Sequence, residues 1–200
     1  MHVADGVLSL SVSVVTYIGA SYLVLKSTKG ISEEEIPKIS LLTGAFFVSS
    51  LINIPIGPTS VHPILSGFLG LVLGKRAPLG IFIGLILQAA LFQHGGISTL
   101  GANTLLMSIP ALFVYWLSRL LKDYSYFAKG FLAGFLGVTT GVCLLILLLF
   151  ITDQRYSEGT FSVIKIVVYT YLPLAVLEAF LTAFSVKYLY SIKPSLFHSD

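Results

Sequence analysis

Long uncharged runs separated by short polar segments dominate the chain. The run over residues 7–25 holds nineteen uncharged residues, about the length that crosses a hydrocarbon core of roughly 30 Å as a helix. The runs over 130–152 and 166–186 are as long, and the second carries one acid, Glu178. Intramembrane ionisable groups are functional suspects, and we expect Glu178 to make a hydrogen bond between helices or a contact that shifts on coupling.

Two longer runs are interrupted by segments rich in proline and glycine. "NIPIGPTSVHP" breaks the run over 39–74, and "QHGGISTLG" breaks the run over 77–118. Such segments end helices and leave backbone polar groups that need partners. We therefore predict an all-α, multi-pass membrane bundle, with residues 1–200 as a single integral-membrane domain. Its seven spans are predicted at 7–25, 39–55, 61–74, 77–92, 102–118, 130–152 and 166–186.

The distribution of lysine and arginine gives the orientation. The third span has fourteen residues, a length at which a segment can also be re-entrant. With seven crossings and the N-terminus outside, ten cations lie inside, and two, Arg155 and Lys165, lie outside. If 61–74 did not cross, the split would be five against seven, which carries no orientation signal. The charges therefore favour seven crossings with an outer N-terminus.

The composition agrees with a membrane protein. Hydrophobic residues make up 56% of the chain, charged residues 10%, and the mean hydropathy is +0.92, whereas a soluble domain carries about 25% charged residues. The one cysteine, Cys143, excludes a disulfide framework or a cysteine-rich zinc site. The net charge of +3 is too dispersed to indicate nucleic-acid binding. Because no cation precedes the first span, we expect that this span is not a cleaved signal peptide.

Three of the four histidines share the predicted outer face. His2 lies in the N-terminal segment, His62 at the outer end of the third span, and His94 in the loop after the fourth. The fourth, His198, lies in the inner polar tail. Each histidine alone is most simply a hydrogen-bonded interfacial residue. Irregular backbone at membrane depth is tolerated where it is buried or lines a cavity, so three imidazoles on one side predict a metal site.

The start of the chain, "MHVADG", adds a chelating group. A free amine on Met1, the deprotonated amide nitrogen of His2 and the Nδ1 of His2 can bind one metal through fused five- and six-membered rings. These three nitrogens are nearly coplanar, and His62 or His94 can supply the fourth. Square-planar nitrogen coordination suits Ni(II) or Cu(II), whereas zinc prefers tetrahedral sites.

The same stretches resemble a known family. "MHVADG", "PTSVHPILSGFLGLVLG" at 58–74, "QAALFQHGGISTLGAN" at 88–103 and "YLPLAVLEAFLTA" at 171–183 resemble the CbiM/NikM family, the substrate-binding membrane (S) components of energy-coupling-factor transporters for cobalt and nickel. The resemblance implies a six-helix S-component core plus an extra N-terminal helix that delivers the N-terminus into the metal pocket. It also implies the cell membrane, with an extracytoplasmic N-terminus.

The resemblance implies a ligand set and partners. Met1, His2 and His62 match the family's metal-binding positions, with His94 as an alternative ligand or a residue beside the ligands. Ni(II) or Co(II) would be the transported substrate, and no organic cofactor is expected. The family uses the same start for both metals, so the preference for nickel comes from the square of nitrogens alone. The expected partners are a transmembrane coupling (T) subunit, cytoplasmic ATP-binding subunits and a small accessory membrane subunit.

Several polar residues lie in or beside the two outer loops: Asn53, Thr59, Ser60, Gln88, Ser98, Thr99 and Asn103. They either satisfy backbone groups or orient the ligand imidazoles. The candidates for the orienting role are Asp5, Asn53, Thr59, Ser60 and Asn103. Glycine rows such as Gly130/Gly134/Gly137/Gly141 predict close helix packing, either internal or against a partner.

Two other functions remain open at this stage. An intramembrane metalloenzyme would need a general base, and the sequence has no H-E-x-x-H helix. A channel or metal-independent carrier would show polar residues recurring along a span, but the spans are apolar apart from Glu178. The chain also lacks a phosphate-binding Gly-rich loop with lysine. We therefore expect a transporter subunit without its own ATPase motif rather than an enzyme.

Overall fold

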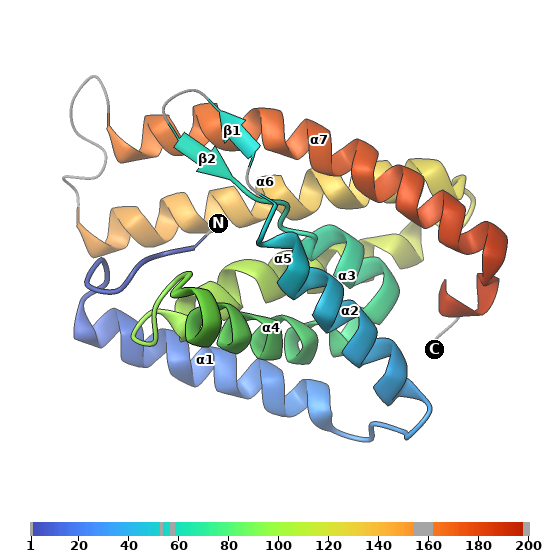
Figure 1. Cartoon of the computed structure of the whole chain (residues 1–200), viewed down its shortest axis with the longest axis horizontal. Helices are drawn as coiled ribbons and strands as arrows, with labels where there is room; N and C mark the ends of the chain where they lie inside the picture. Colours follow the sequence, from blue (N-terminus) through green and yellow to red (C-terminus); the bar gives the residue numbers. More distant parts are fainter. Residues whose placement is uncertain (1, 53, 57–58, 154–161, 198–200) are drawn as a thin grey trace.

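The computed structural model describes residues 2–52, 54–56, 59–153 and 162–197 (Figure 1). Within these residues, helices α1 to α7 form a bundle, and a short antiparallel hairpin of two strands contacts α7. The elements are α1 (Leu10–Thr28), α2 (Glu35–Ser49), β1 (Ile54–Ile56), β2 (Thr59–Val61), α3 (Ser66–Leu73), η1 (Gly74–Arg76), α4 (Ala77–Phe92), α5 (Leu100–Leu120), α6 (Tyr126–Thr152), α7 (Val163–Ile192) and the turn η3 (Pro194–Phe197).

The helices carry apolar surface on their outer sides. Five helical stretches in the described residues are long and apolar enough to cross a membrane: Leu10–Thr28, Ser66–Phe92, Leu100–Leu120, Tyr126–Thr152 and Val163–Ile192. On α1, Leu10, Ile18 and Leu25 are each more than 60% exposed. Apolar surface on this scale needs lipid to cover it. The protein is therefore a multi-pass membrane protein.

The all-α class predicted from the sequence agrees with the structure, apart from the hairpin. The span predicted over 39–55 differs, because α2 ends at Ser49 and β1 begins at Ile54. The span predicted over 61–74 begins with the end of β2, and its helix α3 starts at Ser66. The prolines and glycine of "NIPIGPTSVHP" end the helices as expected, but they also permit a hairpin that the apolar pattern did not reveal.

Helices α3 and α4 fold back on each other across η1. Gln88 lies eleven residues into α4, about 17 Å along the axis at 1.5 Å per residue. His62 precedes the other end of α3. A collinear pair would separate these residues by more than about 27 Å, yet the side chains of both lie within 3.0 Å of the His2 ring. The two helices therefore run in opposite directions from the turn.

Arg76 joins the elements at the end of the bundle that holds this turn. Its buried guanidinium forms an ion pair with Glu35, with an Nη2–Oε2 distance of 2.9 Å. It also donates to the backbone carbonyls of Ser27, Lys29 and Gly30. A buried charge is tolerated where it is paired and fully hydrogen-bonded. The connection between α1 and α2 is thereby fixed to η1.

The C-terminal turn reaches the same end of the bundle. Lys38 in α2 donates to the carbonyl of Leu196 in η3 at 2.7 Å. In Figure 1 the C-terminal end of α7 lies at the right, away from the N-terminal segment. Residues that the sequence assigned to the inner side therefore gather at one end of the structure.

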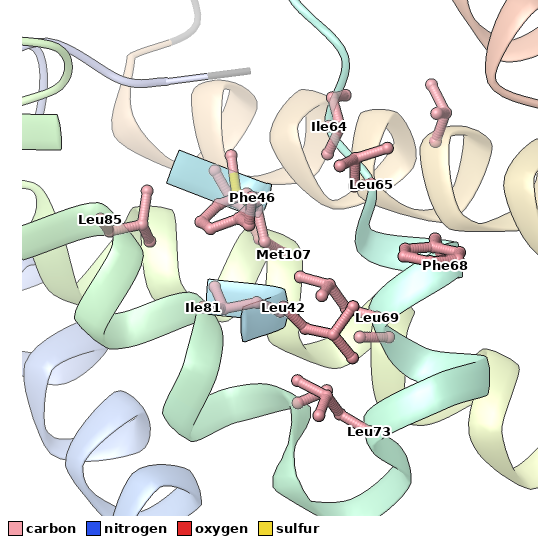
Figure 2. Packing of buried hydrophobic residues seen from close by; sticks show 14 of the residues in the cluster. Leu42, Phe46, Ile64, Leu65, Phe68, Leu69, Leu73, Ile81, Leu85 and Met107 are labelled. Atoms are coloured by element: carbon pink, nitrogen blue, oxygen red, sulfur yellow. The ribbon is translucent and has the colours of Figure 1, made fainter. Parts of the chain in front are cut away.

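The interior is apolar and tightly packed. Figure 2 shows Phe46 of α2, Ile81 of α4 and Met107 of α5 in one cluster with residues of α3, and all three named side chains are fully buried. Because lipid is as apolar as these side chains, their contribution in a membrane comes from close packing more than from leaving water.

The glycine rows pack inside the bundle. A Cβ on Gly130 would meet the backbone of Ala183 at 2.7 Å, and one on Gly134 would collide with the backbone of Glu178. A Cβ on Gly137 would meet the backbone of Gly67 at 2.6 Å. These glycines allow α6 to approach α7 and α3 at backbone distance. For these three glycines, the prediction of close packing inside the protein is therefore confirmed.

Candidate metal centre

The N-terminal segment is tied to the start of α5. Asn103 accepts from the backbone N–H of Val3 at 2.8 Å and donates back to the Val3 carbonyl at 3.0 Å. Thr99 donates to the same carbonyl at 2.7 Å. Asp5 accepts from the backbone N–H of Ser98 at 2.9 Å. These bonds fix the backbone on the C-terminal side of His2.

The imidazoles of His2 and His62 lie next to each other beside this anchored segment. His2 Nδ1 lies 3.0 Å from His62 Nε2, and the ring centroids are 4.9 Å apart. The residues are 60 positions apart in the chain. The fold-back of α3 and α4 and the anchored N-terminal segment bring them together.

The outer nitrogen of each ring is bonded to an acceptor. His2 Nε2 lies 2.8 Å from Gln88 Oε1, and His62 Nδ1 lies 2.9 Å from the Pro63 carbonyl. The Gln88 amide points its NH₂ at the Phe46 carbonyl, at 3.5 Å, which leaves Oε1 facing His2. Since carbonyl oxygens only accept, both outer nitrogens carry the proton. His2 Nδ1 and His62 Nε2 therefore each direct a lone pair into the space that they share.

The separation of these two nitrogens suits a common metal ion. Metal–imidazole nitrogen bonds are about 2.0 Å long, so two neighbouring corners of a square site lie about 2.8 Å apart at that bond length. The observed 3.0 Å is close to this value. His2 Nδ1 is also the ring nitrogen that can close a six-membered chelate ring with the residue's own amide nitrogen.

His94 lies at the edge of this pair. Its side chain is exposed, and its ring centroid is 6.0 Å from that of His2 and 6.1 Å from that of His62. The backbone reaches this place through Gln93, which has a φ of 55° and caps α4. All three predicted imidazoles therefore come together, with His94 on the solvent side.

Burial keeps the two inner imidazoles neutral. Removal from water lowers the pKa of His62 to about 3 and lowers the pKa of His2 well below its ordinary value. His2 precedes α1 and His62 precedes α3, so both imidazoles lie outside the membrane-spanning helices. A neutral imidazole is the form that binds metals.

Glu178 supports the loop that carries His62. This α7 carboxylate is buried and accepts from the backbone N–H groups of Ile64 and Leu65, the latter at 3.2 and 3.3 Å. Leu65 has a φ of 55°, so the chain reverses sharply here before α3 begins. Glu178 thus makes a structural hydrogen bond, but with the loop before α3 instead of between helices as expected. The bonded Ile64 is two residues from His62, a candidate ligand.

The other predicted residues divide into three groups. Asn103 satisfies backbone groups of Val3 instead of bonding to an imidazole in the described residues. Asp5 binds Ser98 instead of an imidazole. Met1 and Asn53, and the side chains of Thr59 and Ser60, lie outside the described residues.

Within the described part of the chain, no three His, Cys, Asp or Glu side chains are arranged to hold a metal ion by themselves. Gln88 was one of the polar residues that the sequence placed beside the outer loops, but it was not among the five candidates for the orienting role. The available signal was an isolated amide in the otherwise apolar run 77–92.

Comparison with known proteins gives the family. A family model described as "Cobalt uptake substrate-specific transmembrane region", named CbiM, matches residues 2–196. The chain belongs to the CbiM family. The match covers both candidate imidazoles, His2 and His62, the anchor at Asn103 and the Glu178 contact.

Curated relatives of this CbiM-family chain have metal-transport names. A putative metal transport protein of Haemophilus influenzae is 34% identical over 60% of this chain and 58% of its own length. A putative fused nickel transport protein NikMN of Archaeoglobus fulgidus is 32% identical over 70% of this chain and 48% of its own length. The chain therefore aligns with about half the length of these two relatives. A putative cobalt transport protein CbiM of Methanococcus voltae is 31% identical over 98% of this chain and 94% of its own length.

Solved structures share the fold. A crystal structure described as a truncated transition metal transporter superposes with a TM-score of 0.79 at 20% identity, covering 99% of this chain and 100% of that chain. The helices of this CbiM-family chain are thus arranged as in a fold that has been seen in a crystal structure.

Proposed function

We propose that this protein captures a divalent transition metal, Ni(II) in preference to Co(II), as the substrate-binding subunit of an uptake transporter. The ligands would be the Met1 amine, the amide nitrogen and Nδ1 of His2, and Nε2 of His62. One observation carries the proposal: His2 Nδ1 and His62 Nε2 direct lone pairs at a shared space from 3.0 Å apart.

The preference for nickel follows from the donor set. Four nitrogens with three in one chelate plane favour a square-planar ion, and Ni(II) adopts that geometry more readily than Co(II) or Zn(II). A deprotonated amide is a strong in-plane donor, which adds to this preference. The relatives' names include both metals, so the geometry is the argument for nickel.

Capture rather than catalysis fits the surroundings of the imidazoles. A hydrolytic metal site needs a general base beside the metal. Asp5, the acid nearest in sequence, is bonded to Ser98. The neighbours of His2 and His62 in the described residues include an amide, a carbonyl and a third imidazole.

The orientation and the partners complete the proposal. The histidine end faces the outside of the cell membrane, the Arg76 end faces the cytoplasm, and the chain crosses seven times. Because the sequence has no phosphate-binding loop, separate ATP-binding subunits and a transmembrane coupling subunit supply the energy.

Calorimetric titration of the purified full chain with Ni(II) and with Co(II) tests the proposal. We expect one nickel per chain, tighter binding of nickel than of cobalt, and a diamagnetic nickel complex, as square-planar Ni(II) gives. The Ser108→Ala variant is the matched control, because Ser108 is buried in α5 with no hydrogen-bond partner for Oγ in the described residues. Absence of nickel binding, or a paramagnetic complex, would contradict the proposed site.

A further inference from the structure

Gln88 is a fully buried amide whose role the metal ligands do not explain. Its side chain is 0% exposed in α4 and makes two contacts in different directions. Oε1 lies 2.8 Å from His2 Nε2, and Nε2 lies 3.5 Å from the backbone carbonyl of Phe46 in α2. The side chain thus connects the N-terminal imidazole with the interior of the bundle.

The Phe46 contact decides which end of the amide faces His2. A reversed amide would place Oε1 against the Phe46 carbonyl, so that two acceptors would meet inside the apolar core, at a cost of an unpaired buried group. The observed orientation presents an acceptor to His2. His2 must then carry its ring proton on Nε2.

The tautomer matters because the two ring nitrogens of His2 are not equivalent for chelation. Nδ1 closes a six-membered ring with the amide nitrogen of the same residue, and Nε2 points away from that amide. A proton on Nδ1 would block the chelate. The geometry points to Gln88 as the positioning residue that holds His2 in the tautomer and ring orientation needed for metal binding, and this inference rests on the proposed function.

The same contact links the site to α2. Phe46 is fully buried in the cluster with Met107, and a Cβ on Gly84 would collide with its ring. A change in the position of α2 would therefore displace the Phe46 carbonyl and, through Gln88, the His2 ring. Partners beyond the ligands typically contribute 10- to 100-fold in metal affinity.

The test compares Gln88→Met and Gln88→Glu in the full-length protein. Methionine keeps the length and removes the acceptor, while glutamate keeps an acceptor for His2 Nε2–H. Nitrogen NMR of metal-free protein labelled at histidine, at about pH 8 where an ordinary imidazole is neutral, identifies the protonated nitrogen. His2→Ala assigns the His2 signals. Nickel affinity is measured on the same samples.

We expect His2 protonated on Nε2 in the wild type and in Gln88→Glu, and a mixture of tautomers in Gln88→Met with nickel affinity lowered by about 10- to 100-fold. Gln88→Asn, whose shorter amide withdraws from His2, must behave like Gln88→Met, and it replaces that variant if methionine prevents folding. Ser108→Ala must match the wild type in both readouts.

Three results would overturn the inference: a mixture of tautomers in the wild type, a wild-type tautomer in Gln88→Met, or a changed tautomer with unchanged nickel affinity. Because the NMR comparison is made without metal, it still decides whether Gln88 sets the tautomer if the wild type binds no nickel. Absence of nickel binding in the wild type would refute the proposed function and leave the role of Gln88 to be decided by the NMR comparison.

Discussion

His2 Nδ1 lies 3.0 Å from His62 Nε2, and each ring donates its other proton away from the pair, to Gln88 and to the Pro63 carbonyl. Two lone pairs thus converge at the end of the bundle opposite the Arg76 ion pair. The arrangement depends on three supports from distant parts of the chain: Asn103 holds Val3, Gln88 holds His2, and Glu178 holds the loop after His62.

Replacement of His62 should lower nickel affinity more than replacement of His94. His62→Ala removes one of four proposed nitrogens, so we expect nickel affinity to fall by more than the roughly 100-fold that supporting residues contribute. His94→Ala should cost less than about tenfold, because its exposed ring lies 6.0 Å or more from the other two. Calorimetry on the purified variants measures both. A larger loss in His94→Ala would make His94 the ligand.

Proton release on nickel binding should reveal the lowered imidazole pKa values. At pH 6 the amine and the amide release about two protons in total, whereas two imidazoles with an ordinary pKa of about 6.5 would raise the total to about 3.5. Burial keeps the pKa of His62 at about 3 and that of His2 well below its ordinary value, so about two is expected.

The same reasoning fixes the sign of the pH dependence. The logarithm of the nickel affinity should rise by about two per pH unit below pH 7 and by about one above pH 8, where the amine is already neutral. Titrations in buffers of different ionisation enthalpy give the proton number. Release near 3.5, with an inflection near pH 6.5, would show that the imidazoles titrate normally.

Glu178 should matter for stability as well as for binding. Glu178→Leu removes the acceptor for Ile64 and Leu65, and each orphaned buried N–H costs about 1–3 kcal/mol. We expect a lower unfolding temperature and weaker nickel binding, with Glu178→Gln milder because one carbonyl oxygen remains. Thermal unfolding in detergent measures the first effect. Unfolding of Glu178→Leu at the wild-type temperature would show that the contact is unimportant.

The glycine row offers a matched pair of variants. A Cβ on Gly134 would collide with the backbone of Glu178 in α7, whereas a Cβ on Gly44 in α2 meets nothing within 4 Å. Overpacking of this kind typically costs about 1–3 kcal/mol. We expect Gly134→Ala to reduce the monodisperse fraction in size-exclusion chromatography and Gly44→Ala to leave it unchanged. Equal behaviour of the two would contradict the close approach of α6 and α7.

Much of this arrangement could be predicted from hydrophobicity, charge and chain reversal. Uncharged runs located the helices, and the separate crossings expected for 61–74 and 77–92 led to His62 and His94 on one side. Asn103 was a candidate for orienting an imidazole, but it bonds to the backbone of Val3, which is the other role considered for a polar residue beside an outer loop. Seven crossings with an outer N-terminus stay a prediction.

The remainder depends on long-range contacts that periodicity does not encode. The β1–β2 hairpin forms where prolines had indicated a helix end alone. Gln88 gains its role from a carbonyl 42 positions away in sequence, and Glu178 gains its role from amides more than 110 positions away. Asp5 was expected near an imidazole, but Ser98 offers it a backbone N–H instead.

The central claim is that the chain's own first amine and the amide of His2 bind the metal. The most direct test is calorimetric titration with Ni(II) of the full-length protein beginning at Met1, verified by mass spectrometry, and of the same protein with one glycine added before Met1. The extension moves the amine and breaks the fused rings, so nickel affinity should fall by more than about 100-fold while thermal unfolding without metal is unchanged. Equal nickel affinity in the two proteins would contradict the account.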